Sequence, residues 1–305
     1  MRLRDFEIIW AVARSRSMRE AGACLGVSQP AVSRALRYAE ERLGFELFRR
    51  EKGRLVATPE LQALMPDVER LFGSLHGIRN RARDMRDSGT GNLTIAAIPT
   101  LASRRLSETI ASFRRTHPRV AIGLAVLPTP LVLERVQRGE ADIGLVHGPL
   151  TESNLDKAPI GANRIVAIVP GGHPLAQMRT VAPRDLRNYS LIAVSRATMP
   201  GALIASAFAR SNIPFATAIE VTTSASTVSL VQAGAGIGLV DAHALENVVL
   251  DGVDLISFMP EMRITIEAVS MPGPRTNANI SLFLQLLRQR FAEGPAIPIE
   301  AGKTG

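Results

Sequence analysis

The side chains best suited to recognition chemistry lie close together near the start of the chain. Gln29, Ser33, Arg34 and Arg37 fall on the polar face of one expected helix, opposite its apolar residues. Glutamine and arginine can make paired hydrogen bonds to the edges of adenine and guanine in the major groove. The cluster therefore predicts contacts with the bases of DNA.

Two short helices joined by a tight turn would present this cluster on the surface. The spacing of apolar residues predicts a first helix over about 3–14 and a second helix that follows Ser17. A turn at Gly26 precedes a third helix, which has Ser28 as a candidate N-cap and ends before Gly44. In a helix-turn-helix, the N-terminus of the second helix of the motif enters the major groove.

A basic ribbon is expected after the third helix. Residues 45–58 alternate weakly in polarity around Gly53, which predicts two short strands joined by a turn. Basic side chains on such a wing can contact phosphate oxygens or enter the minor groove. The basic residues of this predicted wing are Arg49, Arg50, Lys52 and Arg54.

The charge of the chain supports a nucleic-acid partner. Its 305 residues have a formal net charge of +8, and residues 1–88 contain 17 basic and 12 acidic side chains. An uneven basic charge of this kind favours a polyanionic partner.

Composition excludes several other classes of protein. The chain is 46% hydrophobic and 21% charged, which is typical of a folded globular protein. No apolar run approaches the roughly 20 residues of a membrane span, and no apolar segment near the start resembles a secretory signal. Cys24 is the single cysteine, which excludes an internal disulfide, and we expect it to pack in the helical core. These features predict a cytoplasmic protein that does not contact a membrane.

A regular apolar stripe follows the ribbon in residues 59–88. Its residues alternate at intervals of three and four over four heptads, a pattern typical of a coiled coil. We therefore expect a linker helix that pairs with a second copy of the chain. The dimerisation residues predicted on this stripe are Leu61, Leu64, Val68, Leu71, Leu75 and Ile78.

The rest of the chain alternates short apolar strands with amphipathic helices, which indicates an α/β domain with mostly parallel strands. We expect this domain over residues 89–293, with one lobe at about 92–163 and 267–293 and a second lobe at about 164–266. Residues 294–305 are expected to form a loose tail.

Hydroxyl residues follow several predicted strands of this domain. Ligands of α/β folds bind at the carboxyl ends of strands, and hydroxyls beside the N–H groups of a helix start suit a carboxylate. Ordinary helix capping is an equally good explanation for each hydroxyl taken alone. A carboxylate at one of these strand ends could pair with an ammonium or guanidinium group, which favours a zwitterionic ligand. The predicted ligand-binding residues are Pro99, Thr100, Pro128, Thr129, His147, Thr223, Ser224 and Asp241.

The string Ser28-Gln29-Pro30-Ala31-Val32-Ser33, followed by Leu43-Gly44 and Leu47-Phe48, closely resembles LysR-type transcriptional regulators. The resemblance implies an all-α winged helix-turn-helix over 1–58, a coiled-coil linker helix, and a two-lobed α/β effector domain similar to periplasmic solute-binding proteins. It places Gln29, Pro30, Ser33 and Arg34 at the DNA face. It further implies a homodimer or homotetramer on double-stranded DNA with an interrupted dyad.

Weaker similarities suggest a subgroup of this family. The segments 95–99, 127–129 and 240–241 are similar to regulators of opine and basic amino-acid catabolism. His147 departs from this pattern, because an acidic residue is expected there. We therefore predict an effector that is an amino acid or an opine-like zwitterion.

Two other functions remain open at this point. One is a solute-binding protein without a role in transcription, and the helix-turn-helix argues against it. The other is an α/β enzyme, and the sequence shows no catalytic constellation. The glycines of 234–238 follow a helix and precede a strand, which is the reverse of a dinucleotide-binding motif. We expect no cofactor and no metal.

Overall fold

The computed structural model describes residues 2–15, 17–51, 54–86, 91–151, 154–272 and 278–292. The chain forms two compact units: one comprises Met1–Arg79 with Gln137–Gly139, and the other comprises Asn80–Val136 with Glu140–Gly305. Among the described residues, no helix is long and apolar enough to cross a membrane.

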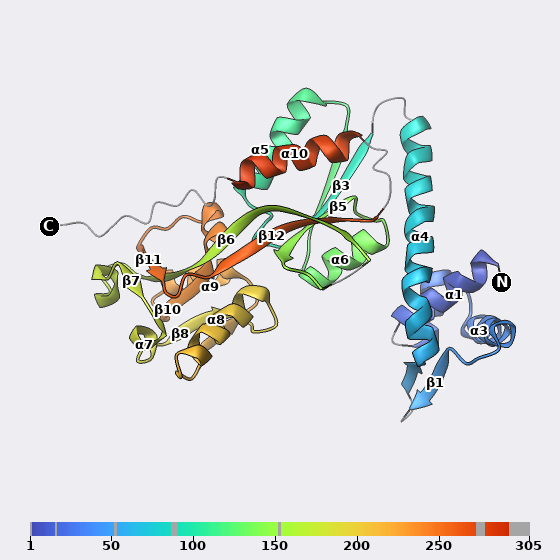
Figure 1. The fold of residues 1–305 in the computed structure, drawn as a ribbon, viewed down its shortest axis with the longest axis horizontal. Coiled ribbons are helices and arrows are strands. Elements are labelled where there is room, and N and C mark those ends of the chain that lie inside the picture. The colour runs from blue at the N-terminus through green and yellow to red at the C-terminus, as the bar shows by residue number, and fades with distance from the viewer. Residues whose placement is uncertain are drawn as a thin grey trace. The chain divides into compact units, whose positions relative to one another are not determined.

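The first unit consists of three short helices, a two-stranded ribbon and most of a long helix (Figure 1). Its core joins apolar residues of all three short helices, and Ile9, Val32 and Leu36 are almost completely buried. The elements are α1 (Leu3–Arg14), α2 (Met18–Leu25), α3 (Gln29–Leu43), β1 (Phe48–Glu51), β2 (Arg54–Ala57) and α4 (Pro59–Arg86).

The predicted capping residues explain most of the helix ends in this unit. Ser17 Oγ accepts a hydrogen bond from Glu20 N at 3.2 Å and caps α2. Gly26 and Gly44 end α2 and α3 with φ of 66° and 79°, the left-handed conformation that favours glycine. Ser28 is the N-cap residue of α3 as predicted, and its backbone carbonyl accepts hydrogen bonds from Ala31 N and Val32 N, whereas its side chain makes no capping hydrogen bond.

The ribbon is tied to α3 by a carboxylate. Glu40 Oε1 accepts hydrogen bonds from Leu47 N at 2.8 Å and Phe48 N at 3.3 Å, so the loop before β1 is held against α3. The Thr58 hydroxyl donates to the Leu47 carbonyl at 3.1 Å, which fixes the other end of the ribbon. These bonds set the position of the ribbon relative to α3.

Part of the apolar stripe of the long helix α4 packs within the first unit. Leu61 and Val68 are buried at 0% and 2% exposure, and Leu61 and Leu64 pack against the core of α1 to α3. The prediction that Leu61 and Val68 contact a partner helix is therefore wrong. Leu71 and Ile78 are exposed at 37% and 54%.

Cys24 also differs from expectation. It is exposed, because the buried face of α2 is formed by Ala21 and Gly22. The predicted packing of this cysteine in the core is wrong.

The described residues of the second unit form ten strands in one continuous sheet. The order is β4-β3-β5-β12-β6-β10-β8-β9, with β11 beside β6 and β7 beside β11. The strands are β3 (Asn92–Ala97), β4 (Ala121–Val126), β5 (Ile143–Gly148), β6 (Asp156–Pro170), β7 (Thr180–Val181), β8 (Leu191–Val194), β9 (Ile219–Val221), β10 (Ile237–Asp241), β11 (Val253–Phe258) and β12 (Arg263–Ser270). The helices are α5 (Arg104–Thr116), α6 (Thr129–Gln137), η1 (Pro174–Gln177), α7 (Pro183–Leu186), α8 (Met199–Arg210), α9 (Ser224–Gln232), η2 (Ala242–Asn247) and α10 (Ala278–Ala292).

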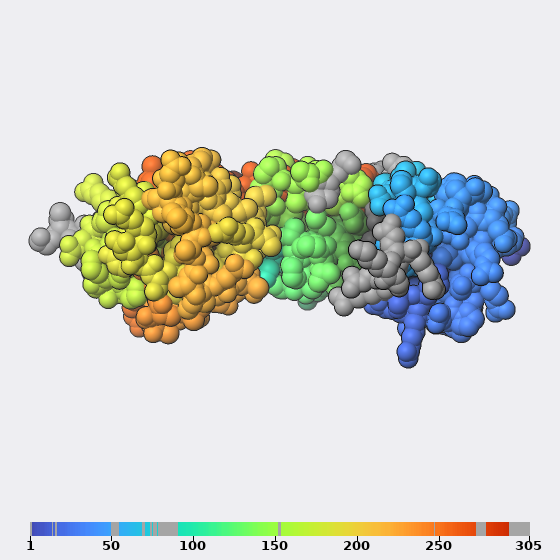
Figure 2. Space-filling model, turned by 90° about the horizontal axis from the view of Figure 1, so that it is seen from below, coloured from blue at the N-terminus to red at the C-terminus, as the bar shows by residue number. Residues whose placement is uncertain are grey.

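This sheet spans two lobes (Figure 1). Lobe I contains β3, β4 and β5 with α5, α6 and α10, and lobe II contains β7 to β11 with α7, α8 and α9. Strand β6 joins them, because its first half pairs with β12 up to Arg164 and its second half pairs with β10 from Ile165. In the space-filling view, the yellow and orange residues of lobe II meet the green residues of lobe I along one boundary (Figure 2).

The first half of β6 was not expected from the sequence, which predicted a strand only from Ile165. Pro159 and Gly161 interrupt the apolar pattern of this segment, and both residue types ordinarily weaken a strand. The neighbouring strand β12 supplies the pairing that the local sequence does not indicate. The expected lobe boundary at 266 lies inside β12, whose pairing with β5 begins at Thr265.

Candidate functional site

A cavity of about 450 Å³ lies between the two lobes of the second unit. It is found where the parallel strands of each lobe end, beyond β3 and β4 on one side and beyond β8 and β9 on the other. This is the position at which α/β folds bind ligands. Its wall is formed by Ile98, Pro99, Thr100, Pro128, Thr129, Pro130, His147, Val194, Ser195, Ala197, Thr198, Met199, Pro200, Thr222, Thr223, Ser224 and Asp241.

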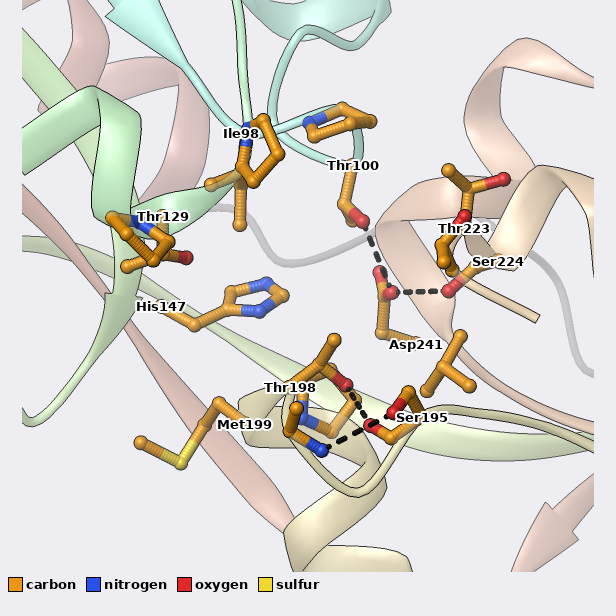
Figure 3. A pocket seen from close by; sticks show the side chains of 17 residues that line it. Ile98, Thr100, Thr129, His147, Ser195, Thr198, Met199, Thr223, Ser224 and Asp241 are labelled. Carbon is orange, nitrogen blue, oxygen red and sulfur yellow. Dashed lines mark hydrogen bonds between the residues drawn. The ribbon is translucent and has the colours of Figure 1, made fainter. Parts of the chain in front are cut away.

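All eight residues that the sequence nominates as ligand contacts line this one cavity. They come from strand ends that are far apart in the chain, and Figure 3 shows their side chains around the same space. Their role in binding an effector stays a prediction.

A further part of the wall was missed. Ser195 directly follows β8, and Thr198 and Met199 lie at the start of α8, which begins three residues before the predicted helix. Thr198 Oγ1 accepts a hydrogen bond from Gly201 N at 3.2 Å and caps this helix. The sequence does carry a signal for this part of the wall. Thr198 follows a strand and is soon followed by a proline, which is the pattern that also marks Thr129.

Three helices begin at the cavity wall: α6 at Thr129, α8 at Met199 and α9 at Ser224. The N-terminus of a helix carries unpaired N–H groups and a partial positive charge, which together attract anions. Thr100 differs from expectation, because α5 begins only at Arg104 and Thr100 lies in a preceding turn. The described lining residues include no lysine or arginine, so these helix starts are the sources of positive potential on the wall itself.

The Asp241 carboxylate is fully buried and already has four hydrogen-bond donors. Asn163 Nδ2 and Ala244 N donate to Oδ1 at 2.9 and 3.2 Å. The hydroxyls of Ser224 and Thr100 donate to Oδ2 at 2.8 and 3.3 Å (Figure 3). The protein itself therefore supplies four donors to this carboxylate, and the pairing of Asp241 with a cationic group of a ligand stays a prediction.

Two buried histidines lie near Asp241. Burial lowers the pKa of His147, and the nearby Asp241 carboxylate opposes this change. Burial also lowers the pKa of His243 to about 4, with Asp241 again opposing it. The His243 ring stacks on Phe291 with a centroid distance of 5.5 Å. Both imidazoles are therefore neutral at pH 7.

A buried ion pair connects the lobes away from the cavity wall. Arg105 Nε of α5 and Glu246 Oε1 of η2 lie 2.6 Å apart, and the two side chains are 9% and 6% exposed. The Arg105 guanidinium also donates to the Arg290 carbonyl of α10. This arginine thus joins two helices of lobe I to lobe II.

The predicted DNA-contacting face lies in the first unit. Gln29, Pro30, Arg34 and Arg37 are exposed on α3, and Ser33 is half-buried. The opposite face of α3 carries the buried residues Val32, Leu36 and Ala39. Arg49 is exposed on β1. Arg50 and Arg54 lie in the ribbon, but their side chains, like the whole of Lys52, fall outside the described residues.

A winged helix-turn-helix linked to a two-lobed domain with a ligand-sized cavity defines a DNA-binding regulator that responds to a small molecule. The family model described as "Bacterial regulatory helix-turn-helix protein, lysR family" matches residues 3–60, and "LysR substrate binding domain" matches residues 86–292. The chain belongs to the LysR family of transcriptional regulators. The alternatives of a solute-binding protein without a role in transcription and of an α/β enzyme are thereby excluded.

Individual relatives agree with this assignment. The octopine catabolism/uptake operon regulatory protein OccR of Rhizobium meliloti is 32% identical over 80% of this chain and 81% of its own length. The transcriptional activator protein LysR of Escherichia coli is 28% identical over 88% and 86%. The structure of a full-length OxyR variant from Pseudomonas aeruginosa covers 94% of this chain and 95% of its own, with a TM-score of 0.67 and 20% identity, which shows the shared fold. LysR regulators bind DNA and small-molecule effectors and form oligomers.

The buried His243 predicts that the protein loses stability in acid. An unfolded histidine takes up a proton below about pH 6.5, whereas folded His243 stays neutral until about pH 4. Because the unfolded state binds more protons in this interval, the free energy of unfolding falls by about 3 kcal/mol as the pH decreases from about 6.5 to 4.

Urea titrations followed by circular dichroism at several pH values measure this loss. His243→Phe keeps the stacking on Phe291 and removes the titrating group, so we expect a smaller decrease in this variant. An equal decrease in the variant and the natural protein would assign the acid sensitivity to other groups.

Proposed function

We propose that the effector of this regulator is a small carboxylate, either an amino acid or an opine-like zwitterion, bound in the cavity between the lobes. The observation that carries this proposal is the convergence of three helix N-termini and their hydroxyl residues on a wall whose described residues include no lysine or arginine. Such a wall favours a carboxylate through N–H groups and hydroxyls. The similarity to OccR, which is named for an octopine operon, supports the same class of ligand.

The position of Asp241 supports a cationic group at the other end of the effector. Its longest hydrogen bond, 3.3 Å, is the one that it accepts from Thr100 Oγ1 of lobe I. An ammonium group in the cavity would replace this hydroxyl as a donor, since a charged donor makes a stronger bond to a carboxylate. Because this bond joins the lobes, a ligand that replaces it would have an affinity that depends on the relative angle of the lobes. A ligand can shift the equilibrium between lobe angles only if its affinity differs between them.

Thr129→Val tests the carboxylate site. The effector is first identified by a thermal-shift screen of amino acids, octopine and aromatic acids against the full chain. Because the variant keeps the shape of the side chain and removes a donor to a charged group, we expect about tenfold weaker binding by calorimetry. Thr180→Val, at an exposed position of lobe II, is the matched control. Unchanged affinity in Thr129→Val would move the carboxylate away from the start of α6.

The exposed N-terminal face of α3 supports a second proposal, namely that Gln29, Ser33 and Arg34 contact base edges while Arg37 and the basic residues of the wing contact the phosphate backbone. This proposal is supported by the burial of the apolar residues of α3, whereas Gln29, Arg34 and Arg37 are exposed on the same helix. A dimer of such units would contact a site with an interrupted dyad, since each copy contacts one half-site.

Arg34→Ala tests the reading helix. We expect a loss of about 1–3 kcal/mol on a specific site, together with weaker discrimination between bases at the contacted position. Arg119→Ala removes one exposed arginine from the second unit and is the control for net charge. Gel-shift titrations at constant salt measure both variants. Equal specific affinity of Arg34→Ala and the natural protein would assign base contacts to another element.

The exposed part of α4 supports a third proposal, that two copies of the chain associate through the stripe formed by Leu71, Leu75 and Ile78. Leu71 and Ile78 are large apolar side chains left exposed on a long helix, at the heptad positions that continue from the buried Val68. Exposed apolar stripes of this spacing pair with a second helix.

Ile78→Asp tests this association. A charge in the seam has no partner and is costly to bury, so we expect the dimer to dissociate at micromolar concentration in light scattering. Gln62→Asp places the same residue type at an exposed polar position of α4 and should leave the dimer intact. An unchanged oligomer in Ile78→Asp would move the contact to the effector domain.

A further inference from the structure

His147 occupies an unusual place in the cavity. It lies near the carboxyl end of β5 in lobe I, and its imidazole points into the space between the lobes (Figure 3). The residue is 5% exposed. Its Nε2 is shielded from solvent and has no hydrogen-bond partner among the described residues.

Several other polar groups of the wall are already engaged. Thr100 and Ser224 donate to Asp241, and Thr198 accepts from Gly201 N. Among the described lining residues, His147 alone keeps a buried side-chain nitrogen or oxygen without a partner. A buried polar atom without a partner is costly, so a ligand that supplies one gains affinity.

The charges near the ring decide which ligand group fits. Burial keeps the imidazole neutral, so one of its nitrogens offers a lone pair. Asp241 is the acidic group on the wall, and no lysine or arginine is found among the described residues that line it. A negative field beside a neutral acceptor favours a positively charged N–H donor over a second carboxylate. The helix starts of α6, α8 and α9 remain for the anionic end of the ligand.

We propose that His147 is a specificity-determining residue, which selects effectors that carry a protonated amine by accepting a hydrogen bond from that amine at Nε2. This inference rests on the proposed function, because it assumes that a carboxylate effector binds in the cavity. It assigns the choice between an amino acid and a simple carboxylic acid to one side chain of lobe I. Asp241 contributes negative charge to the same end of the site.

The test combines a change in the ligand with a change in the protein. The probes are the twenty common amino acids and octopine, and the strongest binder is compared with its analogue that lacks the amine. Full-length natural protein should bind the amine at least tenfold more tightly than the analogue in calorimetry. His147→Leu should remove most of this preference while it leaves the affinity for the analogue within about threefold.

His147→Asn keeps a hydrogen-bonding side chain and should retain part of the preference, which separates a hydrogen-bonding role from the loss of ring volume. His117→Leu replaces a histidine outside the cavity wall and should keep the full preference. Thermal unfolding without ligand confirms that each variant is folded.

The outcomes separate the two proposals. A preference for the amine that persists in His147→Leu, or equal binding of the amine and its analogue by the natural protein, overturns the role of His147 and leaves the carboxylate site standing. No binding of any carboxylate probe by the natural protein overturns the proposed effector class and this inference with it.

Discussion

The effector domain depends on one buried carboxylate. Asp241 receives donors from the turn after β3, from the middle of β6, from the start of α9 and from its own following turn. A buried charge is tolerated only when such donors compensate for its lost hydration. The four donors must therefore converge, and this requirement fixes how lobe I, lobe II and the strand between them meet around the cavity.

Asn163 extends this constraint to the strand that joins the lobes. Its Nδ2 donates to Asp241, while its Oδ1 accepts from Arg164 N at 2.8 Å and from His243 N at 3.2 Å. The side chain lies where β6 changes its partner from β12 to β10. A ligand that alters the bonding of Asp241 thus acts one hydrogen bond away from the crossing of the lobes. If the effector binds as proposed, this proximity gives its binding a direct physical route to the relative angle of the lobes.

The sequence predicts those features that are determined by residues close together in the chain. Ser17, Gly26 and Gly44 mark helix ends by capping and by conformation, and the strand ends at Thr100 and Thr129 converge because parallel strands share one edge. Properties set by distant partners were not predictable. The donors to Asp241 come from up to 141 residues away, and the burial of Leu61 depends on how α4 packs on α1 to α3. The first half of β6 likewise forms because β12 pairs with it, although its own residues disfavour a strand.

The ion pair of Arg105 and Glu246 constrains how these two positions can evolve. With both side chains almost inaccessible to water, loss of either partner leaves a buried charge uncompensated, whereas replacement of both by apolar residues of similar volume is often tolerated. The two positions lie 141 residues apart in the chain. We therefore expect the two positions to covary. A related sequence that lacks one of the two charged residues should lack the other as well, so the residues at these positions of α5 and η2 should change together.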